Sequence, residues 1–261
     1  PLPLLEKNGF GFSAEDLLSR ITPRTRLIII NSPANPTGGV TADAEMKKLV
    51  AGLEKHPDIV VMSDEIYSEI LYEGRKHLSL LTFESMRDRT IMLDGWSKTY
   101  AMTGWRMGYA VWPGKLAELA TRLAINCHSC VNAAAQFAGL AALTGPKDDV
   151  ATMCKAFDER RRFVVDALNK LPGVSCVDAL GAFYVFPNIQ GTGMSAKQME
   201  AGLLNDAGVA TIAGTSFGAH GEGYIRISYA NSLENIAESM KRMEKWLVEK
   251  GVGAKQKAPV A

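Results

Sequence analysis

Three short apolar runs, each closed by a polar loop, most strongly constrain the fold of this chain. They cover residues 26–31 (RLIIIN), 59–62 and 90–93, and they are rich in β-branched or other large apolar side chains. Continuous runs of this kind are typical of strands buried on both faces. A helical pattern at 42–55 separates the first two runs. This order predicts an α/β fold with a mostly parallel sheet, helices on both faces and right-handed crossovers, to which residues 107–111 add a fourth strand.

The pattern changes along the chain and predicts two domains. The first ten residues, PLPLLEKNGF, are expected to form a strand that leads into a helix from Ser13. Helical patterns at 115–126, 131–143 and 148–171 are followed by a mixture of short strands and helices that ends with a helix at 233–249. We therefore predict a large domain over residues 1–155, a smaller α+β domain over 156–250 and a disordered tail over 251–261.

The composition argues against several classes of protein. The chain has 261 residues, of which 47% are hydrophobic, and its net charge of +1 provides no field to attract nucleic acid or an anionic membrane. We find no apolar run of 18 residues and no secretory signal pattern, so we expect a cytoplasmic protein. Cys127 and Cys130 are the only close pair among the four cysteines, which favours reduced thiols over a zinc site.

Polar residues follow the predicted strands at points where ligands are often bound. Asn35 lies in the loop SPANPTGG after the first run, Asp64 in SDEIY after the second, and Lys98 in DGWSKTY after the third. The carboxyl ends of parallel strands meet at one edge of the sheet, where α/β proteins bind their ligands. We therefore expect these three residues to gather at that edge.

A lysine at the end of a buried strand suggests one kind of chemistry. Burial disfavours the ammonium form and lowers the pKa of the amine below its free value of about 10.4. The neutral amine of Lys98 can then attack a carbonyl group and form a Schiff base. From these residues alone, the alternative is that Lys98 is a solvated loop lysine and Arg106 an ordinary surface charge.

The stretch around Lys98 resembles a known signature. Residues 95–108 read GWSKTYAMTGWRMG, which resembles the pyridoxal-phosphate lysine signature of class I and II aminotransferases. The resemblance implies the fold of type I pyridoxal-phosphate enzymes, with pyridoxal 5'-phosphate as the cofactor. It also implies that Lys98 carries the cofactor as a Schiff base and that Arg106 pairs with its phosphate, to which a planar guanidinium group is suited.

The segments SDEIY and NPTG resemble the same family. In the family, the Asp faces the ring nitrogen of the cofactor and keeps it protonated, and a Tyr three residues later meets the phenolic oxygen, so the resemblance gives these roles to Asp64 and Tyr67. Asn35 would donate to the same oxygen and contact the substrate. On pattern alone, Asp64 could instead cap a helix or lie in a surface turn, and NPTG could be an ordinary turn.

Arg226 lies in the alternating pattern YIRIS, on the strand face opposite Ile225 and Ile227. Taken alone, this position fits a solvent-facing strand arginine. The segment GTSFG, followed by GYIRISYA, resembles the C-terminal motif of the family, whose arginine binds the substrate α-carboxylate through two parallel hydrogen bonds. The resemblance thus implies amino acid and 2-oxo acid substrates, with Arg226 as the carboxylate clamp and Lys98 as the base.

The resemblance covers residues 26–230 and implies transfer of an amino group between an amino acid and a 2-oxo acid by a homodimer with shared sites. Members of the family are longer at the N-terminus, so we expect the large, cofactor-binding domain to be incomplete. Gly95 stands where some members have a phosphate-binding serine, and Ser97 is a candidate substitute. The alternatives are a β-eliminating carbon–sulfur lyase, a cofactor-binding regulatory module, or a fragment without catalysis of its own.

Overall fold

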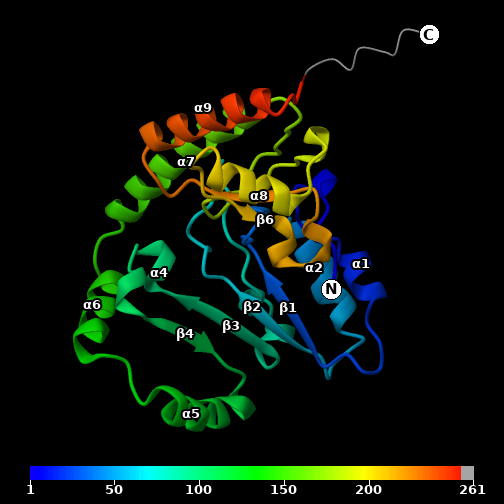
Figure 1. Cartoon of the computed structure of the whole chain (residues 1–261). Helices are drawn as coiled ribbons and strands as arrows, with labels where there is room; N and C mark the ends of the chain where they lie inside the picture. The colour runs from blue at the N-terminus through cyan, green and yellow to red at the C-terminus, as the bar shows by residue number, and fades with distance from the viewer. Residues whose placement is uncertain (254–261) are drawn as a thin grey trace. The chain divides into compact units, whose positions relative to one another are not determined.

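The structure, a computed structural model, describes residues 1–253 and divides into two compact units (Figure 1). The first unit comprises residues 1–35, 39–154 and 180–182. The second comprises residues 36–38, 155–179 and 183–253. Residues 254–261 of the predicted tail lie outside the described residues.

The first unit is built on a four-stranded sheet of order β1-β2-β3-β4. Strands β1 (Leu27–Asn31), β2 (Val60–Asp64) and β3 (Thr90–Gly95) run parallel, and β4 (Gly108–Val111) pairs antiparallel with β3. The predicted α/β fold with a mostly parallel sheet is therefore confirmed. Between β3 and β4 the chain forms only α4 (Trp96–Thr99) and a 3-10 turn at Thr103–Trp105, which are too short for the crossover that a parallel strand requires.

Helices α1 (Ala14–Ser19) and α2 (Asp43–Leu53) pack beside β1 and β2 (Figure 1). Their apolar side chains form one core with the sheet, in which Leu49 of α2 and Ile30 of β1 are buried. Burying an aliphatic side chain of this size contributes about 1.5–3 kcal/mol. Alternate residues of a strand point to opposite faces, and Ile29, on the other face of β1, is 67% exposed.

The remaining elements of the first unit are mostly helical. They are α3 (Glu84–Arg87), α5 (Gly114–His128), α6 (Ala133–Thr144) and the 3-10 turns Glu6–Asn8 and Leu80–Thr82. The strand expected at the start of the chain is not formed, because residues 1–5 are irregular. Pro1 and Pro3 lack the N–H group that a strand residue donates to its neighbour, and no strand pairs with this segment in the described residues.

The second unit contains a small antiparallel sheet covered by helices. Its strands are β5 (Tyr184–Val185), β6 (Ile212–Ala213) and β7 (Ile225–Ser228), in the order β5-β7-β6. Its helices are α8 (Ala196–Asn205), α9 (Leu233–Glu249) and the part of α7 (Asp148–Leu168) from residue 155 onward, with 3-10 turns at Gln190–Thr192, Gly214–Phe217 and Ala219–Gly221. Ser195 and Gln198 form a capping box at the start of α8. Leu203 of α8 and Met243 of α9 are fully buried, so this mixed unit has its own core.

Candidate active site

The side chain of Asn31 joins the carboxyl ends of β1 and β2. Asn31 is in register with Asp64, and its Nδ2 donates to the Asp64 backbone carbonyl over 3.2 Å. Its Oδ1 accepts the backbone N–H of Asn35 at 2.8 Å. One amide side chain therefore fixes the start of the SPANPTGG loop, and with it the exposed residue Asn35, to the edge of the sheet where Asp64 lies. Sequence reasoning missed Asn31, because a strand-end asparagine carries no distinctive pattern.

Asp64 ends β2 with a partly buried carboxylate. Burial raises the pKa of Asp64 above its ordinary value and the nearby charge of Glu65 raises it further, although a hydrogen bond from the backbone N–H of Ile66, at 3.3 Å, lowers it. Within residues 1–253, no cation forms an ion pair with this carboxylate. Asp64 is therefore an acceptor at the strand edge that a positively charged ligand group would stabilise.

Tyr67 and Lys98 meet at the same edge from the segments after β2 and β3. Tyr67 is only 3% exposed. Lys98 lies on α4, directly after β3, and is partly buried, with its Nζ 5.9 Å from the centroid of the Tyr67 ring. Because β2 and β3 are neighbouring parallel strands, their carboxyl ends bring the amine, the phenol and Asp64 to one edge of the sheet.

The short helix α4 is held in place by contacts on two sides. The indole Nε1 of Trp96 donates to the backbone carbonyl of Gly139 over 3.0 Å, and its ring lies edge-on to Tyr109 with centroids 5.4 Å apart. The carboxylate of Asp94 accepts the N–H of Gly95 at 2.6 Å and the hydroxyl of Tyr109 at 3.2 Å. Burial and the charge of Asp94 raise the pKa of Tyr109 to about 12. The phenol therefore stays protonated at neutral pH and holds β4 against the start of α4.

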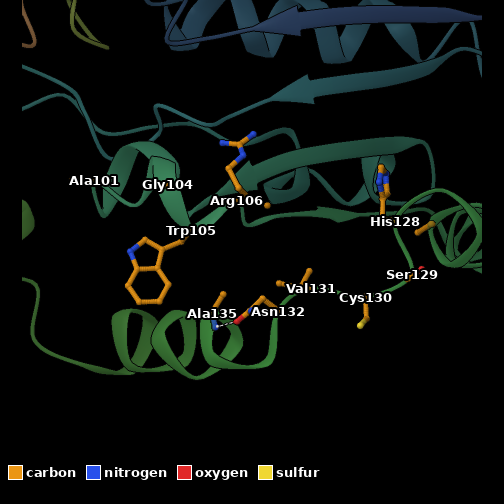
Figure 2. A pocket seen from close by; sticks show the side chains of 12 residues that line it. Ala101, Gly104, Trp105, Arg106, His128, Ser129, Cys130, Val131, Asn132 and Ala135 are labelled. Carbon is orange, nitrogen blue, oxygen red and sulfur yellow. Dashed lines mark hydrogen bonds between the residues drawn. The ribbon is translucent and has the colours of Figure 1, made fainter.

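Arg106 lies between α4 and β4 in a left-handed backbone conformation, with φ of 55°. It is exposed, and its Nη1 donates to the backbone carbonyl of Thr103 over 2.9 Å. It lines a cavity of about 1150 Å³ together with the end of α5 and the segment that follows it, including His128 and Asn132 (Figure 2). Lys98 and Asp64 are not among the residues that line this cavity. The phosphate-binding role of Arg106 stays a prediction.

Arg226 lies on β7 in the second unit, between two aromatic rings. Its guanidinium carbon is 4.7 Å from the centroid of the Tyr184 ring and 5.0 Å from that of Phe217. Cation–π contacts of this kind hold a guanidinium plane in one orientation. Sequence reasoning did not find these two rings, because they come from distant segments, and the carboxylate-binding role of Arg226 stays a prediction.

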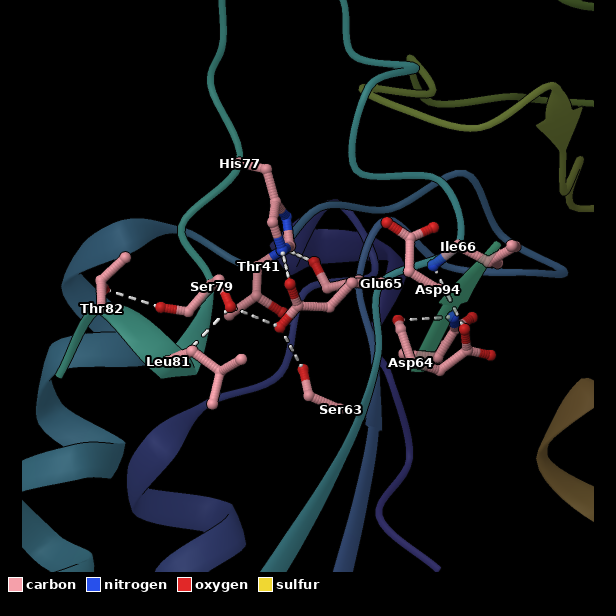
Figure 3. Close-up of polar contacts among 12 residues, drawn as sticks. Thr41, Ser63, Asp64, Glu65, Ile66, His77, Ser79, Leu81, Thr82 and Asp94 are labelled. Carbon is pink, nitrogen blue, oxygen red and sulfur yellow. Dashed lines mark hydrogen bonds and ion pairs between the residues drawn. The ribbon is translucent and has the colours of Figure 1, made fainter. Parts of the chain in front are cut away.

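A buried polar cluster directly behind Asp64 was also missed. Glu65 is 4% exposed and accepts hydrogen bonds from the hydroxyls of Ser63 and Ser79, and it lies against His77 (Figure 3). The signal that could have identified Glu65 is its place in the motif SDEIY, directly after Asp64. Across residues 1–253, no group of three or more His, Cys, Asp or Glu residues is arranged to hold a metal ion, and no helix has the length and apolarity needed to cross a membrane.

Comparisons with known proteins agree with these motifs. Residues 1–243 match the family described as aminotransferase class I and II. An aspartate aminotransferase from Pyrococcus horikoshii is 43% identical over 94% of this chain and 63% of its own length. An aromatic-amino-acid aminotransferase 2 from Thermococcus litoralis is 38% identical over 95% of this chain and 64% of its own length. The chain thus spans less than two thirds of the length of these relatives.

Solved structures give the same result. The crystal structure of an aromatic aminotransferase from Pyrococcus horikoshii superposes with a TM-score of 0.92 at 37% identity, over 96% of this chain and 67% of that one. The family match covers most of the chain, and the resemblance inferred from the motifs is confirmed. The chain therefore belongs to the class I and II aminotransferases, a family of enzymes that depend on pyridoxal phosphate.

Proposed function

We propose that this protein is an aminotransferase that moves an amino group between an amino acid and a 2-oxo acid. The observation that carries the proposal is the meeting of Lys98 and Tyr67, with Nζ 5.9 Å from the ring centroid, at the strand edge where Asp64 ends β2. In a chain of this family, an amine, a phenol and a partly buried carboxylate at one edge are the groups that pyridoxal phosphate requires.

The donor set fits the cofactor in chemical terms. Asp64 has no cationic partner among the described residues, and burial disfavours its charge. A protonated pyridine nitrogen is a cation that would stabilise this carboxylate, and Asp64 would in turn keep that nitrogen protonated. Tyr67 would donate to the phenolic oxygen, as would Asn35, and Arg106 would bind the phosphate. When bound, the cofactor supplies an electron-withdrawing ring that stabilises negative charge at the substrate Cα.

Lys98 has two proposed tasks. Its Nζ would hold the cofactor covalently. When not bound to the cofactor, the amine of Lys98 would act as the base that removes the proton from the substrate Cα and returns a proton during transfer. The anchoring of α4 through Trp96 supports both tasks, because a base must be held within hydrogen-bond reach of the proton it moves.

Arg226 is the proposed clamp for the substrate α-carboxylate. Its guanidinium group is oriented by Tyr184 and Phe217, and a planar guanidinium is suited to binding a carboxylate through two parallel hydrogen bonds. Asn35 is a further proposed substrate contact. The substrate class is therefore amino acids and 2-oxo acids. The named relatives include aspartate and aromatic-amino-acid aminotransferases, and we do not extend either side-chain preference to this chain.

We further propose that the protein acts as a cytoplasmic homodimer. All residues of α5 are at least partly exposed, and large apolar side chains such as Leu119, Leu123 and Phe137 are exposed on α5 and α6. A second copy of the chain would remove such side chains from water. Sedimentation analysis at several protein concentrations tests the dimer, and a monomer at all of them would contradict it.

Borohydride reduction tests the assignment of Lys98. The protein is incubated with pyridoxal phosphate, reduced, digested and mapped by mass spectrometry. The expected result is a label on Lys98, and a label on another lysine alone would reject the assignment.

A single-turnover experiment tests the reaction. The cofactor-loaded protein is mixed with amino acids, and the products are measured. Transamination produces pyridoxamine phosphate and the matching 2-oxo acid without ammonia. Release of pyruvate and ammonia would instead support β-elimination, and a protein that does not bind the cofactor at all would contradict the proposal.

A further inference from the structure

Glu65 is a buried carboxylate that the proposed function leaves without a task. It follows Asp64 at the end of β2, and its backbone N–H donates to the Leu93 carbonyl over 2.8 Å, so its main chain is fixed to β3. Its side chain lies in the interior, where an ionised group is costly unless it has partners. A buried carboxylate next to the strand edge that carries Asp64 therefore needs partners that stabilise its charge.

The partners of Glu65 come from two segments. Oε1 accepts the hydroxyls of Ser63, at 2.9 Å, and Ser79, at 3.0 Å, while Oε2 lies 2.8 Å from Nε2 of His77 (Figure 3). Burial raises the pKa of Glu65, but the contacts with His77 and the two serines outweigh it and leave the pKa below its ordinary value. Glu65 is therefore an anion in the folded protein at neutral pH.

The same contacts fasten the segment after Tyr67 to the sheet. Ser79 not only donates to Glu65 but also caps the 3-10 turn Leu80–Thr82 by accepting the N–H of Leu81 at 3.2 Å. Leu80 is fully buried in the core of the first unit. Hydrogen bonds to Glu65 thus fix both ends of the stretch from Ser63 to Ser79. This stretch contains Asp64 and Tyr67.

The charge of Glu65 also acts on its neighbour. Two carboxylates on successive residues, one partly buried and one buried, disfavour each other's ionised form. The His77 imidazole lies 2.8 Å from Oε2 of Glu65, and when it carries a positive charge it balances the charge of Glu65 and removes most of this repulsion. Without that balance, Asp64 would bind a proton more readily, and a protonated Asp64 cannot stabilise a positively charged ring nitrogen.

We propose that Glu65 and His77 form a charge-balanced positioning pair, which holds the Asp64–Tyr67 turn in place and keeps the Asp64 carboxylate available to the cofactor. The role assigned to Asp64 rests on the proposed function. Neither Glu65 nor His77 touches the cofactor in this proposal, and both act through Asp64. The cofactor is the same as in the proposed function. Glu65 and His77 are the residues that set the charge next to Asp64.

Other ionisable groups nearby must stay constant in a test. Asp94 on β3 and Tyr109 on β4 feel the charge of Glu65, Asp94 also feels that of Glu69 on the turn, and Lys98 on α4 lies over the Tyr67 ring. The test variants leave all of them unaltered. His77→Gln removes the imidazole, Glu65→Gln/His77→Gln removes the carboxylate as well, and Ser79→Ala is the matched control, because it removes a hydrogen bond to Glu65 without changing any ionisable group.

The primary measurement is the pKa of Asp64 in the cofactor-free protein, from ¹³C NMR of labelled carboxyl groups, with Asp64→Asn to assign the signal. We expect His77→Gln to raise the Asp64 pKa by about one unit, as a charge several ångströms away does in a partly buried site. The double variant should return it to the wild-type value, and Ser79→Ala should leave it unchanged. An unshifted Asp64 pKa in His77→Gln would overturn the proposal, because Glu65 would then have taken up the proton itself.

A second measurement follows the cofactor. The absorbance of bound pyridoxal phosphate is recorded against pH, and its transition should move in His77→Gln and return in the double variant. If the protein binds no cofactor, the proposed function fails while the NMR result still decides the inference. If the cofactor binds and the Asp64 pKa does not move, the function stands and the inference fails. Should His77→Gln not fold, His77→Asn provides the same comparison.

Discussion

The Nζ atom of Lys98 lies 5.9 Å from the centroid of the Tyr67 ring, although the two residues follow different strands of the sheet. The meeting results from topology, because β2 and β3 are parallel neighbours and both segments leave the same edge. At this distance the face of the ring attracts an ammonium group. The amine of Lys98 therefore lies beside the turn that carries Asp64.

Replacing Lys98 tests whether this amine is the one that reacts. Lys98→Ala should abolish covalent attachment of pyridoxal phosphate and reduce the rate of amino-group transfer by at least about a hundredfold, the usual contribution of a positioned base. Lys47→Ala, at an exposed position on α2, is the matched control and should behave like the wild type. Equal transfer rates for the two variants would contradict the assignment.

Replacing Asp64 should separate activity from stability. The Asp64→Asn variant keeps the shape of the side chain but cannot keep a ring nitrogen protonated, so the transfer rate should fall by about a hundredfold or more. Asp58→Asn, at an exposed turn before β2, is the control and should leave the rate unchanged. A loss of activity that is matched by a loss of folding would instead indicate a structural aspartate.

The stability of Asp64→Asn relative to the wild type should depend on pH. The pKa of Asp64 is raised by folding, chiefly by burial, so its ionised form destabilises the folded state. The protonated carboxyl group of Asp64 contributes fully to the stability of the folded state below the ordinary pKa of 3.8. This contribution is lost as the pH rises through the higher pKa that Asp64 has in the folded protein. Urea unfolding should therefore show Asp64→Asn to be more stable than the wild type at pH 7, with a difference that shrinks towards pH 4. A less stable variant at pH 7 would contradict this.

The sheet of the first unit could be predicted from sequence because its strands are short, apolar and separated by clear breaks. β2 and β3 begin or end within a residue or two of the runs that predict them. The start of the chain could not be predicted in this way, since residues 1–5 have an apolar pattern but no strand partner in the described residues. Pairing is a tertiary property, and a single segment does not reveal it.

The candidate site was predictable only where residues belong to a local motif. Asp64, Tyr67 and Lys98 lie in such motifs, and the strand order explains why they gather. The partners that hold them, such as His77 against Glu65, come from separate segments whose contact depends on the path of the chain. Spacing along the sequence carries no information about such contacts.

Two glycines that face each other across β3 and β4 allow a matched test of how tightly α4 is placed. Gly95 pairs with Gly108, but a Cβ atom added at Gly95 would lie 2.9 Å from the Met107 carbonyl oxygen, whereas one at Gly108 would lie 3.4 Å from the Asp94 carbonyl oxygen. Gly95→Ala should therefore force the backbones apart, cost about 1–3 kcal/mol and weaken cofactor binding. Gly108→Ala should be nearly neutral in urea unfolding, and equal costs would show that the close contact has no effect.

The last prediction concerns the second unit, where two adjacent arginines of α7 share one partner. Arg161 is 3% exposed, with Nε 2.9 Å from Asp158 and Nη1 donating to the buried carbonyl of Ala179 over 3.2 Å. Arg162 also binds Asp158, but its side chain is 70% exposed. Arg161→Met should cost about 1–3 kcal/mol in urea unfolding, because the Ala179 carbonyl loses this donor in the interior.

Arg162→Met should cost less than about 1 kcal/mol, since water replaces the lost contact. The comparison is informative because both variants remove a positive charge near Asp158, whereas only Arg161 is buried and also lies 3.6 Å from the exposed Asp178. If the two costs were equal, the charge near Asp158 would be the stabilising factor, and the contact between α7 and the Ala179 carbonyl would contribute little to the fold of this unit.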